Sequence, residues 1–179
     1  MKFLRNVIGI LVLGLSLAPV YANPSPPNRP SLEELKRNLL RDNKTAAKNL
    51  RAVDVSKAQV ILYSLNPKGN EDFQPNTSTV FHGFPILGQA EIIDARDKAA
   101  MLTALASGIE KSDGTVAACF DPRHGLRVTT PSGELDLSIC FECLQVYTFP
   151  GAQRVTTTRK PSKSYNSLLE KYHLPRAKE

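Results

Sequence analysis

Residues 134–149 read ELDLSICFECLQVYTF, and this stretch decides the fold class. From residue 135 to residue 141 every second residue is apolar, which is the period of a β-strand with one buried face. After Cys143 the apolar residues fall on the opposite parity. A one-residue β-bulge between Cys140 and Cys143 would invert the pattern in this way and would place both cysteines on one face. We therefore expect one long, bulged strand over this stretch.

The neighbouring segments add further strands to this one. Runs of β-branched and aromatic residues predict strands over 58–65, 79–93, 115–120 and 126–130. Glycine and proline interrupt the second of these, so we expect it to be bent and to lie at an edge of the sheet. Short turns separate the later strands, which favours antiparallel pairing. The sequence therefore predicts an α+β domain, with a mainly antiparallel sheet of about four to five strands packed by two or three helices.

Three segments have the apolar spacing of amphipathic helices. The first begins at Ser31, where Glu34 three residues later completes a capping box. The second begins at Asp94, and the third carries its apolar face over residues 165–172. These helices are expected to cover the sheet.

Residues 1–22 have the pattern of an export signal. Lys2 and Arg5 provide a positive start, and the uncharged run that follows is too short to span a bilayer. We expect a periplasmic or secreted protein, with no transmembrane anchor remaining after signal cleavage. The predicted organisation is a signal peptide over 1–22, a proline-rich tether over 23–30, a single α+β domain over 31–174 and a tail over 175–179.

The composition excludes several classes of protein. The chain has 179 residues, of which 41% are hydrophobic and 22% charged, and this is unlike a disordered or collagen-like chain. The net charge is +6, but the densest basic stretch, residues 154–163, contains no aromatic residue. A nucleic-acid surface needs a basic stripe and aromatic stacking groups. We therefore expect an unknown ligand or an envelope protein as the partner, and no nucleic acid.

All three cysteines and one of the three histidines fall between residues 119 and 143. Residues 119–125 read CFDPRHG, residues 140–143 read CFEC, and His82 stands upstream between Phe81 and Gly83. In these motifs the chain resembles a group of uncharacterised exported bacterial proteins that share C-F-x-P-R-H-G and C-F-E-C. The resemblance covers about residues 58–149. The resemblance implies that this segment matters for function, but it does not imply any particular activity.

Four interpretations of the cysteines are open. Cys119, His124, Cys140 and Cys143 could bind Zn²⁺ as a Cys₃His set. Alternatively, Cys119 forms a cross-strand disulfide with Cys140 or Cys143, as an oxidising compartment favours. The third interpretation is a redox C-x-x-C pair, although such a pair uses a helix N-terminus rather than a strand. In the fourth, the cysteines are small buried hydrophobic residues. No cofactor is expected, apart from zinc under the first interpretation.

Strand geometry predicts which disulfide would form. On an extended strand the Cα atoms of Cys140 and Cys143 would be roughly 10 Å apart, and a disulfide spans less than about 7 Å. Opposed residues of neighbouring antiparallel strands can lie about 4.5 Å apart. We therefore expect any bridge to join Cys119 to Cys140 or Cys143, leaving the third thiol free.

Asp121 followed by Pro122 predicts a turn over residues 121–125. Arg123 and His124 in this turn are candidate ligand-binding residues, with His82 and Glu142 as further members of the set. A guanidinium group and an imidazole in one turn suit an anionic ligand. The alternative is structural, with Arg123 paired to an acid such as Glu142 and His124 capping the turn.

The sequence contains no complete catalytic template, because G-x-S-x-G, H-E-x-x-H and a glycine-rich phosphate loop are all missing. It favours a non-catalytic ligand- or partner-binding domain centred on residues 119–125 and 140–143. The alternative is a zinc-binding or thiol-dependent protein, including an enzyme, that uses the Cys/His cluster.

Overall fold

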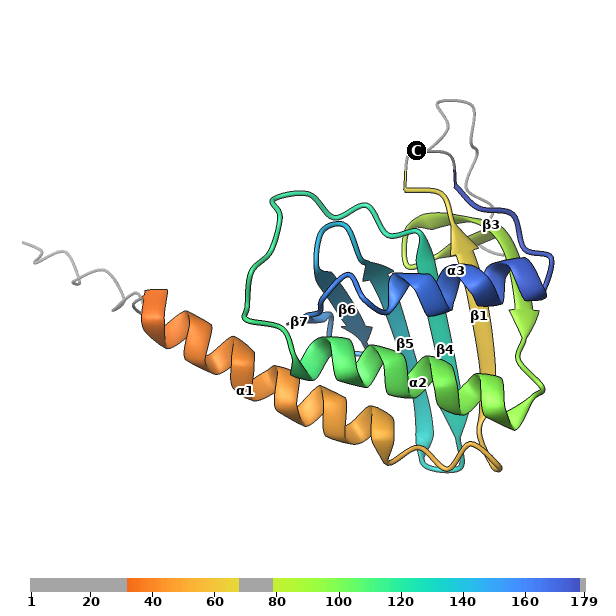
Figure 1. Ribbon diagram of the computed structural model, residues 1–179, viewed down its shortest axis with the longest axis horizontal. Coiled ribbons are helices and arrows are strands. Elements are labelled where there is room, and N and C mark those ends of the chain that lie inside the picture. The colour runs from red at the N-terminus through yellow and green to blue at the C-terminus, as the bar shows by residue number, and fades with distance from the viewer. Residues whose placement is uncertain (1–31, 68–78, 178–179) are drawn as a thin grey trace, which may run out of the picture. The chain divides into compact units, whose positions relative to one another are not determined.

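The computed structural model describes residues 32–67 and 79–177 (Figure 1). The predicted export signal over 1–22 and tether over 23–30 lie outside these residues. The elements are α1 (Leu32–Arg51), β1 (Gln59–Leu65), β2 (Val80–Phe81), β3 (Phe84–Glu91), α2 (Ala95–Glu110), β4 (His124–Thr130), β5 (Gly133–Cys140), β6 (Gln145–Phe149), β7 (Gln153–Thr156) and α3 (Ser162–Lys171).

The strands form one curled antiparallel sheet in the order β2-β3-β1-β4-β5-β6-β7. The predicted α+β class is confirmed, but the described sheet has seven strands rather than about four to five. Three additional strands, together with the loss of the predicted strand over 115–120, account for the number. The segment 79–93 folds into two strands, the stretch 134–149 divides into β5 and β6, and the basic segment after residue 150 contributes β7. The bent segment does lie at the edge of the sheet, as predicted.

The three helices cover one face of the sheet (Figure 1). Asp94 caps α2 by accepting hydrogen bonds from the backbone N–H groups of Arg96 and Asp97. The core between the helices and the sheet is formed by the apolar stripe of each helix and by alternate residues of the strands. Its fully buried members include Leu62, Met101, Leu105, Ile109, Leu126, Leu137, Ile139, Tyr165 and Leu169.

Asn43 fixes α1 to the edge strand β7. Its side-chain amide donates to the Thr156 hydroxyl at 2.7 Å and accepts from the Thr156 backbone N–H at 2.9 Å. Ser112, which follows α2, also bonds the Thr156 hydroxyl at 2.7 Å. All three residues are buried, so this network joins α1, the end of α2 and β7 with its polar groups paired.

The hairpin of β2 and β3 packs on the opposite face of the sheet. His82 and Gly83 form its two-residue turn with φ values of 47° and 88°, as a type I′ turn requires. Phe81 stacks on Tyr63 with ring centroids 4.4 Å apart. A Cβ atom at Gly125 would lie 2.9 Å from the Phe81 ring, so this glycine leaves the room that the hairpin needs.

Two further predictions about residues 115–125 are wrong. Residues 115–120 are not a strand, because they form no ladder with a neighbouring strand. The Ala117 N–H donates to the Cys143 carbonyl, the Thr115 N–H donates to the Asp113 carboxylate, and Gln145 bonds two carbonyls of the segment. The predicted turn over 121–125 ends earlier, since His124 is already the first residue of β4. His124 therefore does not cap a turn.

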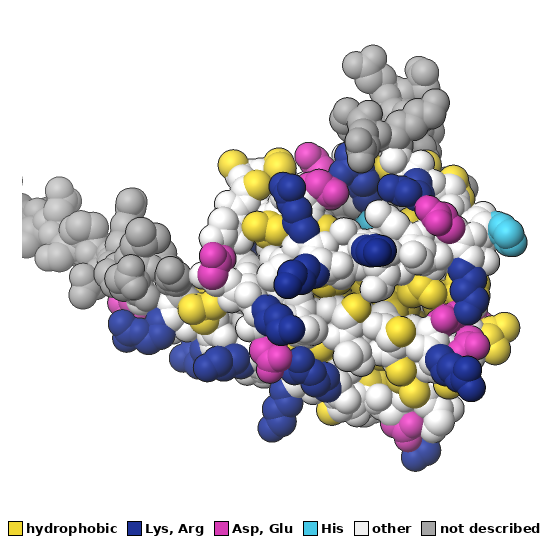
Figure 2. All heavy atoms as spheres, viewed as in Figure 1, with side chains coloured by type: hydrophobic (Ala, Val, Ile, Leu, Met, Phe, Trp, Pro, Cys, Tyr) yellow, Lys and Arg dark blue, Asp and Glu magenta, His cyan; other side chains and the backbone are white. Residues whose placement is uncertain are grey.

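Lys and Arg side chains are spread over the helix-covered face, with Asp and Glu side chains between them (Figure 2). On this face they do not form a continuous basic stripe. None of the described helices is both long enough and apolar enough to cross a membrane.

Candidate functional site

The cysteine cluster is built on the turn that joins β5 to β6. Cys140 ends β5 and pairs with Gln145, the first residue of β6, so residues 141–144 form a tight connection between them. Leu144 has a φ of 59°, which reverses the chain without a glycine. The inverted apolar parity of this stretch is therefore the result of a hairpin turn, and the predicted bulge is wrong.

The turn produces a disulfide that differs from the predicted one. A bond joins Cys140 to Cys143, whose Cα atoms are 5.2 Å apart. The prediction of a bridge from Cys119 to either residue assumed an extended strand, in which these two Cα atoms would be roughly 10 Å apart. The reversal at residues 141–144 removes that separation. Both bonded cysteines are buried, with Cys140 0% and Cys143 1% exposed.

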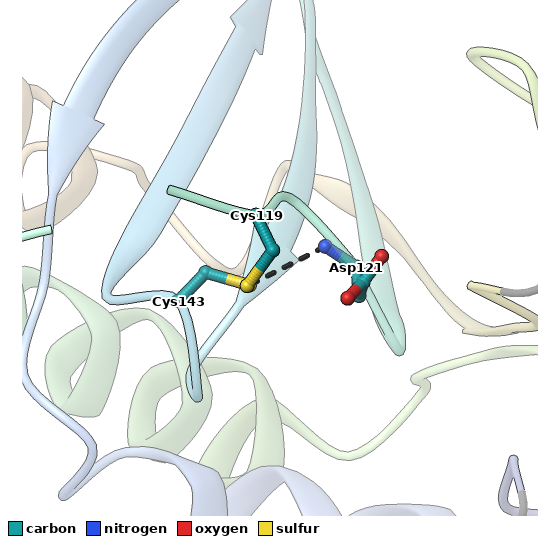
Figure 3. Close-up of side chains that lie close together, drawn as sticks. All are labelled: Cys119, Asp121 and Cys143. Carbon is teal, nitrogen blue, oxygen red and sulfur yellow. Dashed lines mark hydrogen bonds between the residues drawn. The ribbon is translucent and has the colours of Figure 1, made fainter. Parts of the chain in front are cut away.

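Cys119 is a free, exposed thiol next to this disulfide. Its Sγ atom lies 3.4 Å from the Sγ atom of Cys143. The segment is held there by Gln145, whose amide donates to the carbonyls of Ala117 and Cys119 at 2.8 and 2.9 Å. Figure 3 shows the side chains of Cys119 and Cys143 pointing toward one another.

Each sulfur of the disulfide accepts a hydrogen bond from the backbone. The Asp121 N–H donates to Cys143 Sγ at 3.3 Å (Figure 3). The Cys143 N–H donates to Cys140 Sγ at 3.1 Å. Such donors stabilise a thiolate more than a thiol, because hydrogen bonding to a charged form favours that form.

The predicted Cys₃His zinc set is not assembled. In the described part of the chain, the potential ligand atoms that lie within 4.8 Å of one another belong to Cys119, Asp121 and Cys143. His124 is absent from this group because it faces α3, where its Nε2 atom lies 3.0 Å from Asn166 Oδ1. His124 pairs with Ile139 across β4 and β5, so alternation along β5 places Cys140 on the face of the sheet opposite to His124. Asp121 is a candidate ligand that sequence analysis missed, although it stands two residues after Cys119.

Arg123 and His124 lie beside the CFEC turn and have different partners. Arg123 forms an ion pair with Glu142 at 3.4 Å, as the structural alternative predicted. His124 is 5% exposed, and its ring contacts the rings of Phe141 and Tyr165. Burial lowers the pKa of His124 to about 4, despite the hydrogen bond with Asn166. At neutral pH this imidazole is uncharged.

His82 does not join Arg123, His124 and Glu142. It stacks on Phe149 with ring centroids 3.7 Å apart, and its Nε2 atom lies 2.7 Å from Asp136 Oδ2. Arg127 makes a two-pronged ion pair with the same carboxylate at 2.8 and 2.7 Å. Burial alone would raise the pKa of Asp136, but the hydrogen bonds from Arg127 and His82 outweigh it and the pKa is lowered.

Sequence analysis missed this Arg127–Asp136 pair, although a signal existed. Residues 131 and 132 form a two-residue loop, because Thr130 pairs with Gly133. That register places Arg127 opposite Asp136, and the sequence shows the Pro-Ser-Gly turn that sets it. The position of His82 had no such signal, since it depends on how the β2–β3 hairpin folds over the sheet.

No protein-family model, no curated protein and no solved structure matches this chain. The candidate site therefore stands on its own geometry.

Proposed function

We propose that this chain is an exported partner-binding domain that exchanges disulfides with a partner protein through Cys119. The observation that carries the proposal is the 3.4 Å separation between the exposed Cys119 thiol and Cys143 Sγ of a buried disulfide. The disulfide itself is not exposed, so a partner thiol meets Cys119 first. Cys119 transmits the exchange between the surface and the Cys140–Cys143 pair.

The first step is an internal exchange. The Cys119 thiol gives its proton to solvent, and its thiolate attacks Cys143 Sγ. The Cys119–Cys143 bond forms, the Cys140–Cys143 bond breaks, and Cys140 leaves as a thiolate that then takes up a proton. No net oxidation occurs. The Cys143 N–H already bonds Cys140 Sγ and stabilises this leaving thiolate.

The second step transfers the disulfide to the partner. A partner thiolate attacks the exposed Cys119 sulfur, so a mixed disulfide forms and Cys143 leaves as a thiolate. The Asp121 N–H is in place to stabilise this leaving group. A second partner thiolate then attacks the partner sulfur of the mixed disulfide and releases Cys119. The partner dithiol is thereby oxidised to a disulfide, and the protein disulfide is reduced to two thiols.

The test compares oxidation of a dithiol peptide by the oxidised protein and by its Cys119→Ser variant, which retains the Cys140–Cys143 bond. We expect the variant to react at about one tenth of the wild-type rate or below, because direct attack on the buried disulfide requires local opening of the turn. Ala118→Ser, a change in the same exposed segment, should react like the wild-type protein. Equal rates for the wild-type protein and Cys119→Ser would contradict the proposal.

A metal site in the reduced protein is a second candidate function. The grouping of Cys119, Asp121 and Cys143 favours it, and reduction would free Cys140 as a further thiolate beside them. Thiolate and carboxylate ligands suit zinc. Zinc binding at one equivalent by the reduced protein, lost in Asp121→Asn and in Cys119→Ser, would support a metal site, whereas exchange through Cys119 needs no Asp121 carboxylate.

A further inference from the structure

A small polar pocket lies on the other side of the CFEC turn, against α3. Its volume is about 60 Å³, and its polar lining comes from Arg123, His124, Glu142, Ser162, Asn166 and Arg176. At about 15 Å³ for each water, the pocket has room for roughly four waters, which is close to the size of a phosphate or sulfate ion. The size therefore suits a small ionic group and excludes a drug-sized molecule.

The C-terminal segment is folded back to bring Arg176 to this pocket. At the end of α3 the His173 N–H donates to the Glu170 carbonyl, and the Leu174 N–H donates to the Leu169 carbonyl at 2.8 Å. With His173 at a φ of 55°, this is a Schellman ending. The Ser64 hydroxyl then donates to the Pro175 carbonyl and holds the following residue beside β1.

The charges and donors of the pocket favour a negative occupant. Two guanidinium groups, from Arg123 and Arg176, and one carboxylate, that of Glu142, line the pocket. Outside the lining, Arg176 also forms an exposed ion pair with Glu170 at 3.4 Å, which leaves its other nitrogens for a ligand. Arg123 uses one of its terminal nitrogens on Glu142. Its Nε–H is buried and has no hydrogen-bond partner among the described residues. A buried donor without an acceptor is costly, so a shift of the Arg123 side chain that brings this Nε–H to an acceptor in the pocket would be favourable.

We propose that this pocket binds a small oxyanion, either free or as the end group of a larger ligand. Arg123 and Arg176 supply charge-assisted hydrogen bonds, and the Ser162 hydroxyl is a further donor. The neutral His124 pairs with Asn166 and keeps that amide in place. This site is independent of the exchange through Cys119, because none of the three cysteines lines the pocket.

The test is a titration of the full oxidised protein with inorganic phosphate, followed by NMR at the Arg123 Nε–H and the Asn166 side-chain amide. We expect both signals to shift and saturate together. Arg176→Ala should weaken phosphate binding by about tenfold, as loss of a charged hydrogen bond predicts. Glu142→Gln should strengthen it, because the opposing carboxylate is removed. Lys163→Ala is the matched control, since it removes one positive charge from α3 outside the pocket lining.

The result that would overturn the proposal is phosphate binding that Lys163→Ala weakens as much as Arg176→Ala, or the lack of any saturable shift at Arg123. Acetate titration identifies the kind of anion. Displacement of phosphate by acetate would indicate a carboxylate-bearing ligand, and binding of phosphate and sulfate alone would indicate a tetrahedral oxyanion. Thermal unfolding of Arg176→Ala should match the wild-type protein, because this side chain is half exposed.

Discussion

Cys143 Sγ is shared between two cysteines, because it is bonded to Cys140 and lies 3.4 Å from the thiol of Cys119. In the observed arrangement Cys143 is bonded to Cys140, and in the alternative arrangement it would be bonded to Cys119. Cys140 is fixed at the end of β5, while Cys119 belongs to a segment that makes no strand. An exchange between them therefore requires movement of the 115–120 segment and leaves the sheet intact.

Removing Cys140 should shift the bond to the neighbouring thiol. In Cys140→Ser the Cys119 and Cys143 sulfur atoms remain about as close as they are here, so we expect a Cys119–Cys143 disulfide to form under mild oxidation. Peptide mapping of the oxidised variant checks this result. Cys143→Ser, which removes the shared sulfur, should form its remaining bridge more slowly. Two free thiols in oxidised Cys140→Ser would contradict the shared position of Cys143.

Asp136 should be a major contributor to stability. Asp136→Asn leaves the Arg127 guanidinium and the His82 ring without their charged acceptor, and we expect a loss of about 3 kcal/mol in the free energy of unfolding. Glu134→Gln is the control, because its exposed pair with Arg127 should be worth less than about 1 kcal/mol. Urea unfolding measures both. Similar small losses in the two variants would contradict the role assigned to Asp136.

Because of the Asp136 carboxylate, the free energy of unfolding should depend on pH in the acidic range. The pKa of Asp136 is lowered in the folded protein, so the unfolded chain binds its proton at a higher pH than the folded one does. The stabilisation is therefore complete above the unfolded pKa, near 4, and is lost as pH falls through the folded pKa. In Asp136→Asn this part of the acid dependence should be absent.

His124 should make the protein less stable between pH 6.5 and pH 4. Burial lowers its folded pKa to about 4, so in this window the unfolded chain takes up a proton that the folded chain does not. Stability then falls as pH decreases, by about 3 kcal/mol over the window. His124→Asn should flatten the dependence of stability on pH. His173→Asn is the control and should not flatten it, because His173 is exposed and asparagine tolerates the left-handed backbone at this position. An unchanged curve in His124→Asn would sink this explanation.

Gly108 marks the closest approach of α2 to the segment that leads into α3. A Cβ atom there would lie 2.5 Å from Pro161 Cγ and 2.6 Å from Thr157 Oγ1. We expect Gly108→Ala to cost about 2 kcal/mol, even though alanine favours a helix. Thr103→Ala, on the exposed side of α2, should be neutral or stabilising. Thermal unfolding compares them, and an equally stable Gly108→Ala would show that the segment yields without cost.

The helices and the first strand could be predicted because their signals are local. The apolar spacing and the Asp94 cap define α2, and the β-formers before Asn66-Pro67 define β1. The CFEC turn could not be predicted in this way. Phe141 is an aromatic residue typical of strands, Leu144 is apolar, and the turn has no glycine, proline or asparagine. Its geometry depends on a left-handed Leu144 and on the disulfide, which are set by the folded chain.

The location of the candidate site was predicted, but several of the residue pairs within it were not. The cysteines do gather, and Arg123 does meet Glu142. The sequence could not show that His124 faces α3, because the prediction placed this residue in a turn rather than in the first position of β4. A residue in a strand has a fixed side, and this side separates His124 from the sulfur atoms.

The most direct test of the exchange through Cys119 is the position of the mixed disulfide. Oxidised protein is mixed with a limiting amount of a single-cysteine peptide, quenched with acid, digested and mapped by mass spectrometry. Attachment of the peptide to Cys119, with Cys140 and Cys143 recovered as free thiols, is the predicted result. Attachment of the peptide to Cys140 or Cys143, with Cys119 unmodified, would contradict it.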